Sequence, residues 1–130
     1  MGHVYYGEYL VWLEYGRTEL LRSLGRSYCQ WEDDYGVFLP VTSCSLKYLY
    51  PAQYDDLIAV ETTMQRLTRA SVTFTYAISN ATTGRLLSTA ETSHVFTNAD
   101  GKIIRTADRL LPEFFSRSIC EASQAVESAR

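Results

Sequence analysis

The chain has 130 residues and a mass of 14.8 kDa, and 46% of its residues are apolar. This is enough for one domain with a hydrophobic core, and it excludes an intrinsically disordered chain. Twelve basic and fifteen acidic side chains give a net charge of −3, which leaves no cationic surplus for a nucleic-acid backbone. The longest apolar run covers the five residues 9–13, far fewer than the roughly 20 that span a bilayer. We therefore expect a soluble protein with no membrane span and no nucleic-acid partner.

The cysteines and histidines do not form a recognisable ligand pattern. Cys29, Cys44 and Cys120 are odd in number and far apart, which suits neither a disulfide framework nor a metal site. His3 and His94 are also distant in sequence, so no close metal-ligand spacing is present. The N-terminus lacks the basic and apolar regions of a signal peptide. We expect free thiols in the cytoplasm and no bound metal.

The N-terminal part of the chain has the periodicity of a helix. Apolar and small residues recur at intervals of three to four from residue 7 to residue 24, and Gly25 is a typical stop. Residues 25–36 have no clear period, and we expect an irregular connection there. The residues predicted to lie on the buried face of the helix are Tyr9, Leu13, Gly16, Leu20 and Leu24.

After this helix the period changes from 3.6 to 2, which predicts four strands near residues 43–50, 58–65, 71–78 and 86–96. The residues predicted to face the core are Cys44, Leu46, Tyr48 and Tyr50 in the first strand, Ile58, Val60, Thr62 and Met64 in the second, Val72, Phe74, Tyr76 and Ile78 in the third, and Leu86, Ala90, Thr92, His94 and Phe96 in the fourth.

Polar turn signals separate these strands at residues 51–56 and 80–84, and another follows at 98–101. Pro112 then favours the start of a short C-terminal helix. Its apolar side would carry Phe115, Ile119, Ala122 and Val126. The predicted architecture is a single α+β domain over residues 1–130, in which one antiparallel sheet is covered by the first helix. The polar outer face of such a sheet favours a homodimer.

The opening segment, residues 2–17, resembles the start of the hotdog-fold acyl-CoA thioesterases, which include the 4-hydroxybenzoyl-CoA thioesterases and the Tol-Pal-associated acyl-CoA thioesterases. The matching residues are Gly2, Val4, Tyr5, Tyr6, Tyr9, Glu14 and Arg17. Weaker matches occur at residues 54–56, 69–71 and 94–96. The resemblance implies a long antiparallel sheet wrapped around one central helix. The family places its first strand and its catalytic Asp before the position of Met1, so the resemblance also implies that the sequence begins inside a longer family member.

Thioester hydrolysis requires a polarised carbonyl and an attacking oxygen. A helix N-terminus supplies free amide groups and a positive dipole end, and the best donor here is the Tyr6 N–H, with Gly7 allowing close approach. By the resemblance, the upstream Asp would attack or would activate water. Within this chain, Glu8 in the first helical turn and His3 are the alternative candidates, although each has an ordinary structural explanation.

A different mechanism is implied by the enediyne polyketide thioesterases, a branch of the same family that lacks the carboxylate. That branch relies on a Tyr and an Arg at positions matching Tyr9 and Arg17. Arg17 would then anchor the thioester and Tyr9 would orient it. The ordinary alternative is a core tyrosine together with a surface ion pair between Glu14 and Arg17.

Coenzyme A carries phosphates, so its site requires a few local cations. The resemblance assigns this role to Arg69 and Ser71, and less firmly to Arg66. No cofactor is expected, because coenzyme A enters as part of the substrate. We expect an acyl-CoA or acyl carrier protein thioester hydrolase that is a homodimer or homotetramer with its site between subunits. The alternative is an inactive hotdog module that binds acyl thioesters or only oligomerises.

Overall fold

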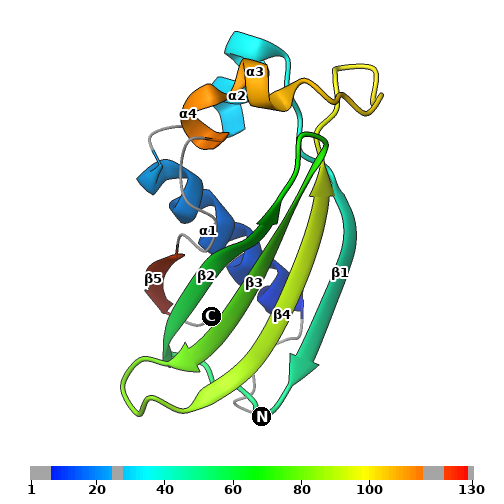
Figure 1. Ribbon diagram of the computed structural model, residues 1–130. Helices are drawn as coiled ribbons and strands as arrows, with labels where there is room; N and C mark the ends of the chain where they lie inside the picture. The colour runs from blue at the N-terminus through cyan, green and yellow to red at the C-terminus, as the bar shows by residue number, and fades with distance from the viewer. Residues whose placement is uncertain (1–6, 25–27, 116–121, 129–130) are drawn as a thin grey trace.

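A computed structural model describes residues 7–24, 28–115 and 122–128. Its helices and strands follow the order α1 (Gly7–Ser23), α2 (Tyr28–Tyr35), β1 (Val41–Tyr48), β2 (Leu57–Leu67), β3 (Ser71–Asn80), β4 (Leu86–Val95), α3 (Ala107–Leu110), α4 (Pro112–Phe115) and β5 (Ala122–Ser128). The five strands form one antiparallel sheet in the order β1-β4-β3-β2-β5. The sheet curves around α1, and α2, α3 and α4 gather at the end where β2 turns into β3 (Figure 1).

The predicted first helix is confirmed as α1, and a glycine brings it close to the sheet. The helix packs mainly against β2, β3 and β5. A Cβ atom added at Gly16 would overlap the Thr62 hydroxyl and lie 2.8 Å from the Val60 Cγ1 atom. Only a glycine therefore allows this approach of helix and sheet.

The alternating patterns of β2 and β3 are confirmed, because their predicted core residues are buried against α1. In β4 the prediction fails at one position. The register shifts between Ile78 and Ser79, so that Ser79 pairs with Leu86 and Ile78 pairs with Ser88. This bulge exposes Leu86, which was predicted to face the core, and buries Leu87 instead.

The tyrosines at the end of β1 were expected in the core, and this is wrong. Tyr48 is 44% exposed and Tyr50 is 49% exposed. β1 is an edge strand. Nearly all its residues are exposed because α1 packs mainly against β2, β3 and β5, toward the opposite edge of the sheet.

The expected irregular connection contains a helix, α2. Its anchor is Trp31, which is 1% exposed and contacts the rings of Phe96 and Phe114 at centroid distances of 6.3 and 4.9 Å. With only eight residues, α2 is too short to show a periodicity that could be recognised from sequence.

The predicted C-terminal helix is also corrected. It is a single turn, α4, and the residues expected to continue it form β5 instead, which pairs antiparallel with β2 from Leu57 to Thr63. The edge of β2 offers unpaired backbone groups, and pairing with β5 satisfies them. Ile119 lies outside the described residues.

Candidate active site

The entrance of α1 is the first candidate region. Gly7 is the first residue of α1 and Glu8 lies in its first turn, where the helix dipole favours an acid. Tyr9 is buried, and its hydroxyl accepts a hydrogen bond of 3.2 Å from the Ala52 amide. Its ring contacts the rings of Trp12 and Tyr48, as expected of a core tyrosine. Tyr6 and His3 lie outside the described residues.

Arg17 lies at a distance from this entrance. Ten residues of helix separate it from Gly7, which corresponds to about 15 Å. Arg17 is half-buried, and its Nη1 atom donates a hydrogen bond of 3.4 Å to the Tyr76 hydroxyl of β3. Its guanidinium is thus directed toward the sheet. A surface ion pair with Glu14, the alternative interpretation of Arg17, would place it only at the surface.

The three residues proposed for coenzyme A lie at the opposite end of the sheet. Arg66 and Arg69 are exposed. The Ser71 hydroxyl is 2.8 Å from the Thr68 hydroxyl within the β2–β3 turn.

The register shows how far this turn is from the entrance of α1. Tyr48, which contacts Tyr9, pairs with Ser88, whereas Ser71 pairs with Val95. The seven residue steps along β4 from Ser88 to Val95 span about 23 Å. A single chain therefore does not bring the two groups of candidate residues together.

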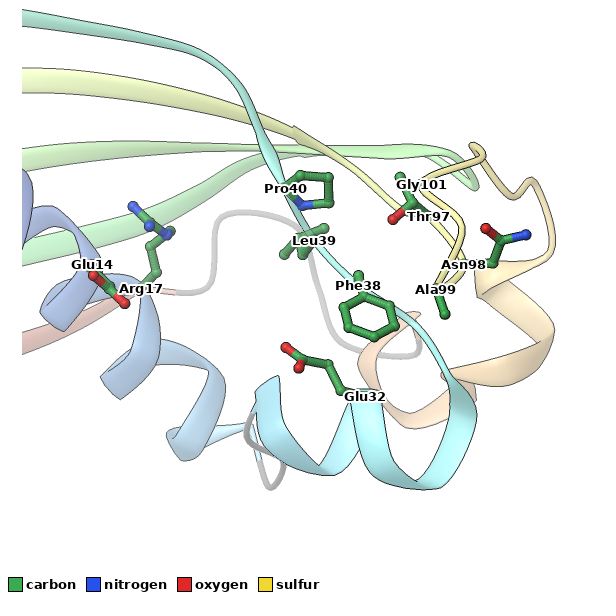
Figure 2. Close-up of a pocket in the computed structure, with 10 residues that line it drawn as sticks. All are labelled: Glu14, Arg17, Glu32, Phe38, Leu39, Pro40, Thr97, Asn98, Ala99 and Gly101. Atoms are coloured by element: carbon green, nitrogen blue, oxygen red, sulfur yellow. The ribbon is translucent and has the colours of Figure 1, made fainter.

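A pocket of about 530 Å³ lies beside α1 (Figure 2). Arg17 and Glu14 form one wall, the segment before β1 forms another, and the loop after β4 closes the far side. The lining residues are Glu14, Arg17, Glu32, Phe38, Leu39, Pro40, Thr97, Asn98, Ala99 and Gly101.

The loop on the far side of the pocket is the turn predicted at residues 98–101. The Asn98 side-chain oxygen accepts hydrogen bonds from the amides of Asp100 and Lys102. The Gly101 amide donates to the Asn98 carbonyl, and Gly101 has a φ of 81°, a conformation that favours glycine. The wall is therefore fixed by its own turn chemistry.

Behind this pocket, polar side chains occupy the inner face of β4. The Tyr76 hydroxyl lies 2.6 Å from the Thr92 hydroxyl. Thr92 lies 2.9 Å from His94 Nε2, and His94 Nδ1 lies 3.3 Å from the Leu39 carbonyl oxygen. The prediction that His94 faces the core is confirmed, and each of its ring nitrogens has a hydrogen-bond partner.

Burial changes the acid–base behaviour of this cluster. Burial, and secondarily the Arg17 guanidinium, lowers the pKa of His94 from 6.5 to about 4. Burial also raises the pKa of Tyr76 above 10.0, although Arg17 opposes this shift. At neutral pH, His94 and Tyr76 are both uncharged.

The sequence analysis placed Tyr76 and Thr92 on the core face without giving them a role. The sequence does contain a signal for them. Both are polar residues at core-facing positions of strands whose other core-facing residues are mostly apolar. The contributions of Glu32 and of residues 97–101 to the pocket had no sequence signal, because they depend on the path of the chain around α2 and after β4.

Two further observations concern ligands and membranes. Within the part of the chain that the structure describes, no three His, Cys, Asp or Glu side chains lie close enough to hold a metal ion. None of the described helices combines the length and hydrophobicity needed to cross a membrane. Cys44 is a free, exposed thiol, whereas Cys120 lies outside the described residues.

Solved structures with the same fold define the class of protein. A DHNA-CoA thioesterase from Staphylococcus aureus has a TM-score of 0.82 and 30% identity, over 89% of this chain and 76% of that chain. A 4-hydroxybenzoyl-CoA thioesterase, solved with 4-hydroxybenzoyl-CoA, has a TM-score of 0.75 and 25% identity, over 86% of each chain. The sheet around α1 is a hotdog fold, and the class is that of the hotdog thioester hydrolases.

The sequence match identifies the family. Residues 1–87 match the Thioesterase superfamily, and the chain belongs to this family. A relative assigned as an acyl-CoA thioesterase, YneP of Bacillus subtilis, is 36% identical over 95 residues, which are 73% of this chain and 67% of the relative.

Proposed function

We propose that the chain hydrolyses acyl-CoA or acyl carrier protein thioesters at a site shared by two copies of the chain. The observation that carries this proposal is the separation, within one chain, of the α1 entrance from the β2–β3 turn. The names of the relatives support a coenzyme A thioester as the substrate.

At the entrance of α1, backbone amides would polarise the thioester carbonyl. The first amides of a helix have no acceptor within the helix and lie at its positive dipole end. The Tyr6 N–H is the proposed donor, and Gly7 leaves room for the acyl group beside it. As water adds to the carbonyl carbon, negative charge develops on the carbonyl oxygen, where such a donor stabilises it. The carbon–sulfur bond then breaks, and the thiolate leaves and takes up a proton.

The attacking water requires a base. Glu8 in the first turn and His3 are the candidates within this chain. Tyr9 is less suited to contact the thioester, because its side chain is only 1% exposed.

The edge strand β1 supports pairing between copies. Among the strands that the structure describes, none pairs with its outer edge, and the backbone groups of such an edge readily pair with another strand. Val41 and Tyr48, large apolar residues of β1, are 48% and 44% exposed. Antiparallel pairing of two copies along this edge would give one continuous sheet with both α1 helices on the same face.

Such pairing would also bring the α1 entrance of one copy close to the β2–β3 turn of the other copy. In an antiparallel pair, the start of the partner's β1 lies beside the end of this chain's β1. The start of β1 is the end of the sheet that carries the β2–β3 turn. Arg69 of the partner subunit would then bind the phosphates of an extended coenzyme A whose thioester lies at Gly7, with Ser71 and Arg66 beside it. Coenzyme A is substrate here, and no separate cofactor is required.

The test is thiol release from a panel of aromatic, short-chain and long-chain acyl-CoAs, followed with a thiol reagent, with acyl carrier protein thioesters in parallel. We expect release from at least one substrate, and the Glu8→Gln variant shows whether Glu8 is the base. Binding of the panel without any release would contradict the proposal and would indicate an inactive acyl-thioester-binding module.

A further inference from the structure

The polar cluster behind the pocket is a chain of four hydrogen bonds with one possible direction. At one end, the guanidinium of Arg17 can only donate, and at the other end, the Leu39 carbonyl can only accept. His94 must therefore carry its proton on Nδ1, which leaves Nε2 as an acceptor because the ring is neutral. The Thr92 hydroxyl donates to Nε2 and so accepts from the Tyr76 hydroxyl.

Both ends of this chain are walls of the 530 Å³ pocket, since Arg17 and Leu39 line it (Figure 2). The three connecting side chains lie behind the pocket wall, at 1–3% exposure. A continuous set of hydrogen bonds thus fixes the guanidinium relative to the backbone at the opposite wall, and determines the width of the pocket between them.

Stability alone does not explain three buried polar side chains at this place. The ring of Phe74 packs edge-on against His94 at a centroid distance of 5.4 Å, so apolar residues would fit the same surroundings. A buried polar network usually adds specificity of position more than stability, because each group loses water on folding.

The charges around the pocket indicate what Arg17 can bind. Glu14 and Glu32 also line the pocket, and two carboxylates beside one guanidinium disfavour a phosphate. Phe38, Leu39 and Pro40 offer apolar surface. The lining therefore suits an acyl group with an apolar body and an oxygen that accepts from Arg17.

We propose that Tyr76, Thr92 and His94 are positioning residues, which hold Arg17 so that its guanidinium binds an oxygen of the acyl group in this pocket. This inference rests on the proposed function, because it assigns the pocket to the acyl part of the same thioester. The carbonyl site at Gly7 is about 15 Å from Arg17 along the helix, so the implied substrate is a long acyl chain with an oxygen near its far end.

A matched pair of threonines tests the inference. Thr92 and Thr62 are both buried on the inner face, at 2% and 0% exposure, but the Thr62 hydroxyl has no hydrogen-bond partner among the described residues. For a long-chain acyl-CoA with an oxygen near the end of its chain, Thr92→Val should lower kcat/KM about tenfold, and Thr62→Val should leave it within about twofold. Equal effects of the two substitutions would overturn the inference.

The second measurement is a double-mutant cycle with Arg17→Met. If Thr92 acts through Arg17, Thr92→Val should have no further effect on kcat/KM in the Arg17→Met background. The positioning role would be overturned if Thr92→Val caused the same loss of kcat/KM in both backgrounds, or if Arg17→Met alone had no effect. Neither result would contradict the proposed thioester hydrolysis.

A chain that binds but does not hydrolyse is tested through affinity. The same cycle is measured on the Kd of a non-hydrolysable acyl-CoA thioether, and the same non-additive pattern is expected. Non-additive effects on Kd in a chain that releases no thiol would contradict the proposed hydrolysis but support the positioning role. Absence of both hydrolysis and binding in the wild-type chain would overturn both proposals.

Discussion

The inner face of the sheet has two halves that bury their side chains for different reasons. The apolar half, β2 and β3 under α1, carries mainly apolar side chains such as Met64 and Ile78, both 0% exposed. The polar half, β4 with the edge strand β1, buries Thr92 and His94 just as deeply, whereas β1 is largely exposed. Depth of burial is therefore similar in the two halves. What distinguishes the polar half is that its buried groups are joined by hydrogen bonds to Arg17 and to the Leu39 carbonyl.

The largest effect is expected where α1 covers the apolar half. Leu20 and Leu10 lie on the same helix, at 0% and 53% exposure. Leu20→Ala should lower the free energy of unfolding by about 2–5 kcal/mol, because it removes core contacts and leaves a cavity. Leu10→Ala, the control, should change it by less than about 0.5 kcal/mol. Chemical denaturation measures both, and similar losses would contradict the assigned burial of the helix.

The polar half should respond to acid. The folded-state pKa of His94 is about 4, lower than its ordinary value of 6.5, so between these values the unfolded chain binds a proton that the folded chain does not. Stability is therefore retained above about pH 6.5 and lost as the pH falls toward 4, by about 3 kcal/mol in total. The His94→Gln variant should lose this part of the pH dependence. An unchanged profile in the variant would refute the buried, neutral state of His94.

A smaller effect is expected at the contact between α1 and β2. Gly16→Ala introduces a Cβ that overlaps the Thr62 hydroxyl, and overpacking of this kind costs about 1–3 kcal/mol. Alanine would otherwise stabilise a helix relative to glycine. A gain in unfolding free energy would show that helix and sheet are less close than the structure has them.

The sequence predicted the apolar half more accurately than the polar half. In β2 and β3, strict alternation is enough to identify the buried residues, because both strands lie under one helix. The prediction for Leu86 is wrong because the bulge shifts the register at this end of β4, and the alternation in the rest of the strand does not reveal it. Tyr48 and Tyr50 follow the period of two that is typical of a strand. Periodicity alone, however, does not show that α1 leaves β1 uncovered.

The candidate site was predictable only in part. The resemblance singled out Arg17, yet its contact with Tyr76 joins residues 59 positions apart, and such a contact depends on tertiary packing. Similarly, residues 112–126 fit a helical period, whereas pairing with the open edge of β2 decides the conformation of Ala122–Ser128.

The most direct test of a site shared between copies is a mixed-dimer experiment. One variant carries Gly7→Val at the α1 entrance, and the other carries Arg69→Ala with Ser71→Ala at the β2–β3 turn. Each alone should hydrolyse acyl-CoA poorly, because both of its sites contain a defect. After unfolding and refolding together, half of the dimers are mixed and each has one intact site, so about one quarter of wild-type activity should return. A mixture no more active than the sum of its two components would contradict a site built from two copies of this chain.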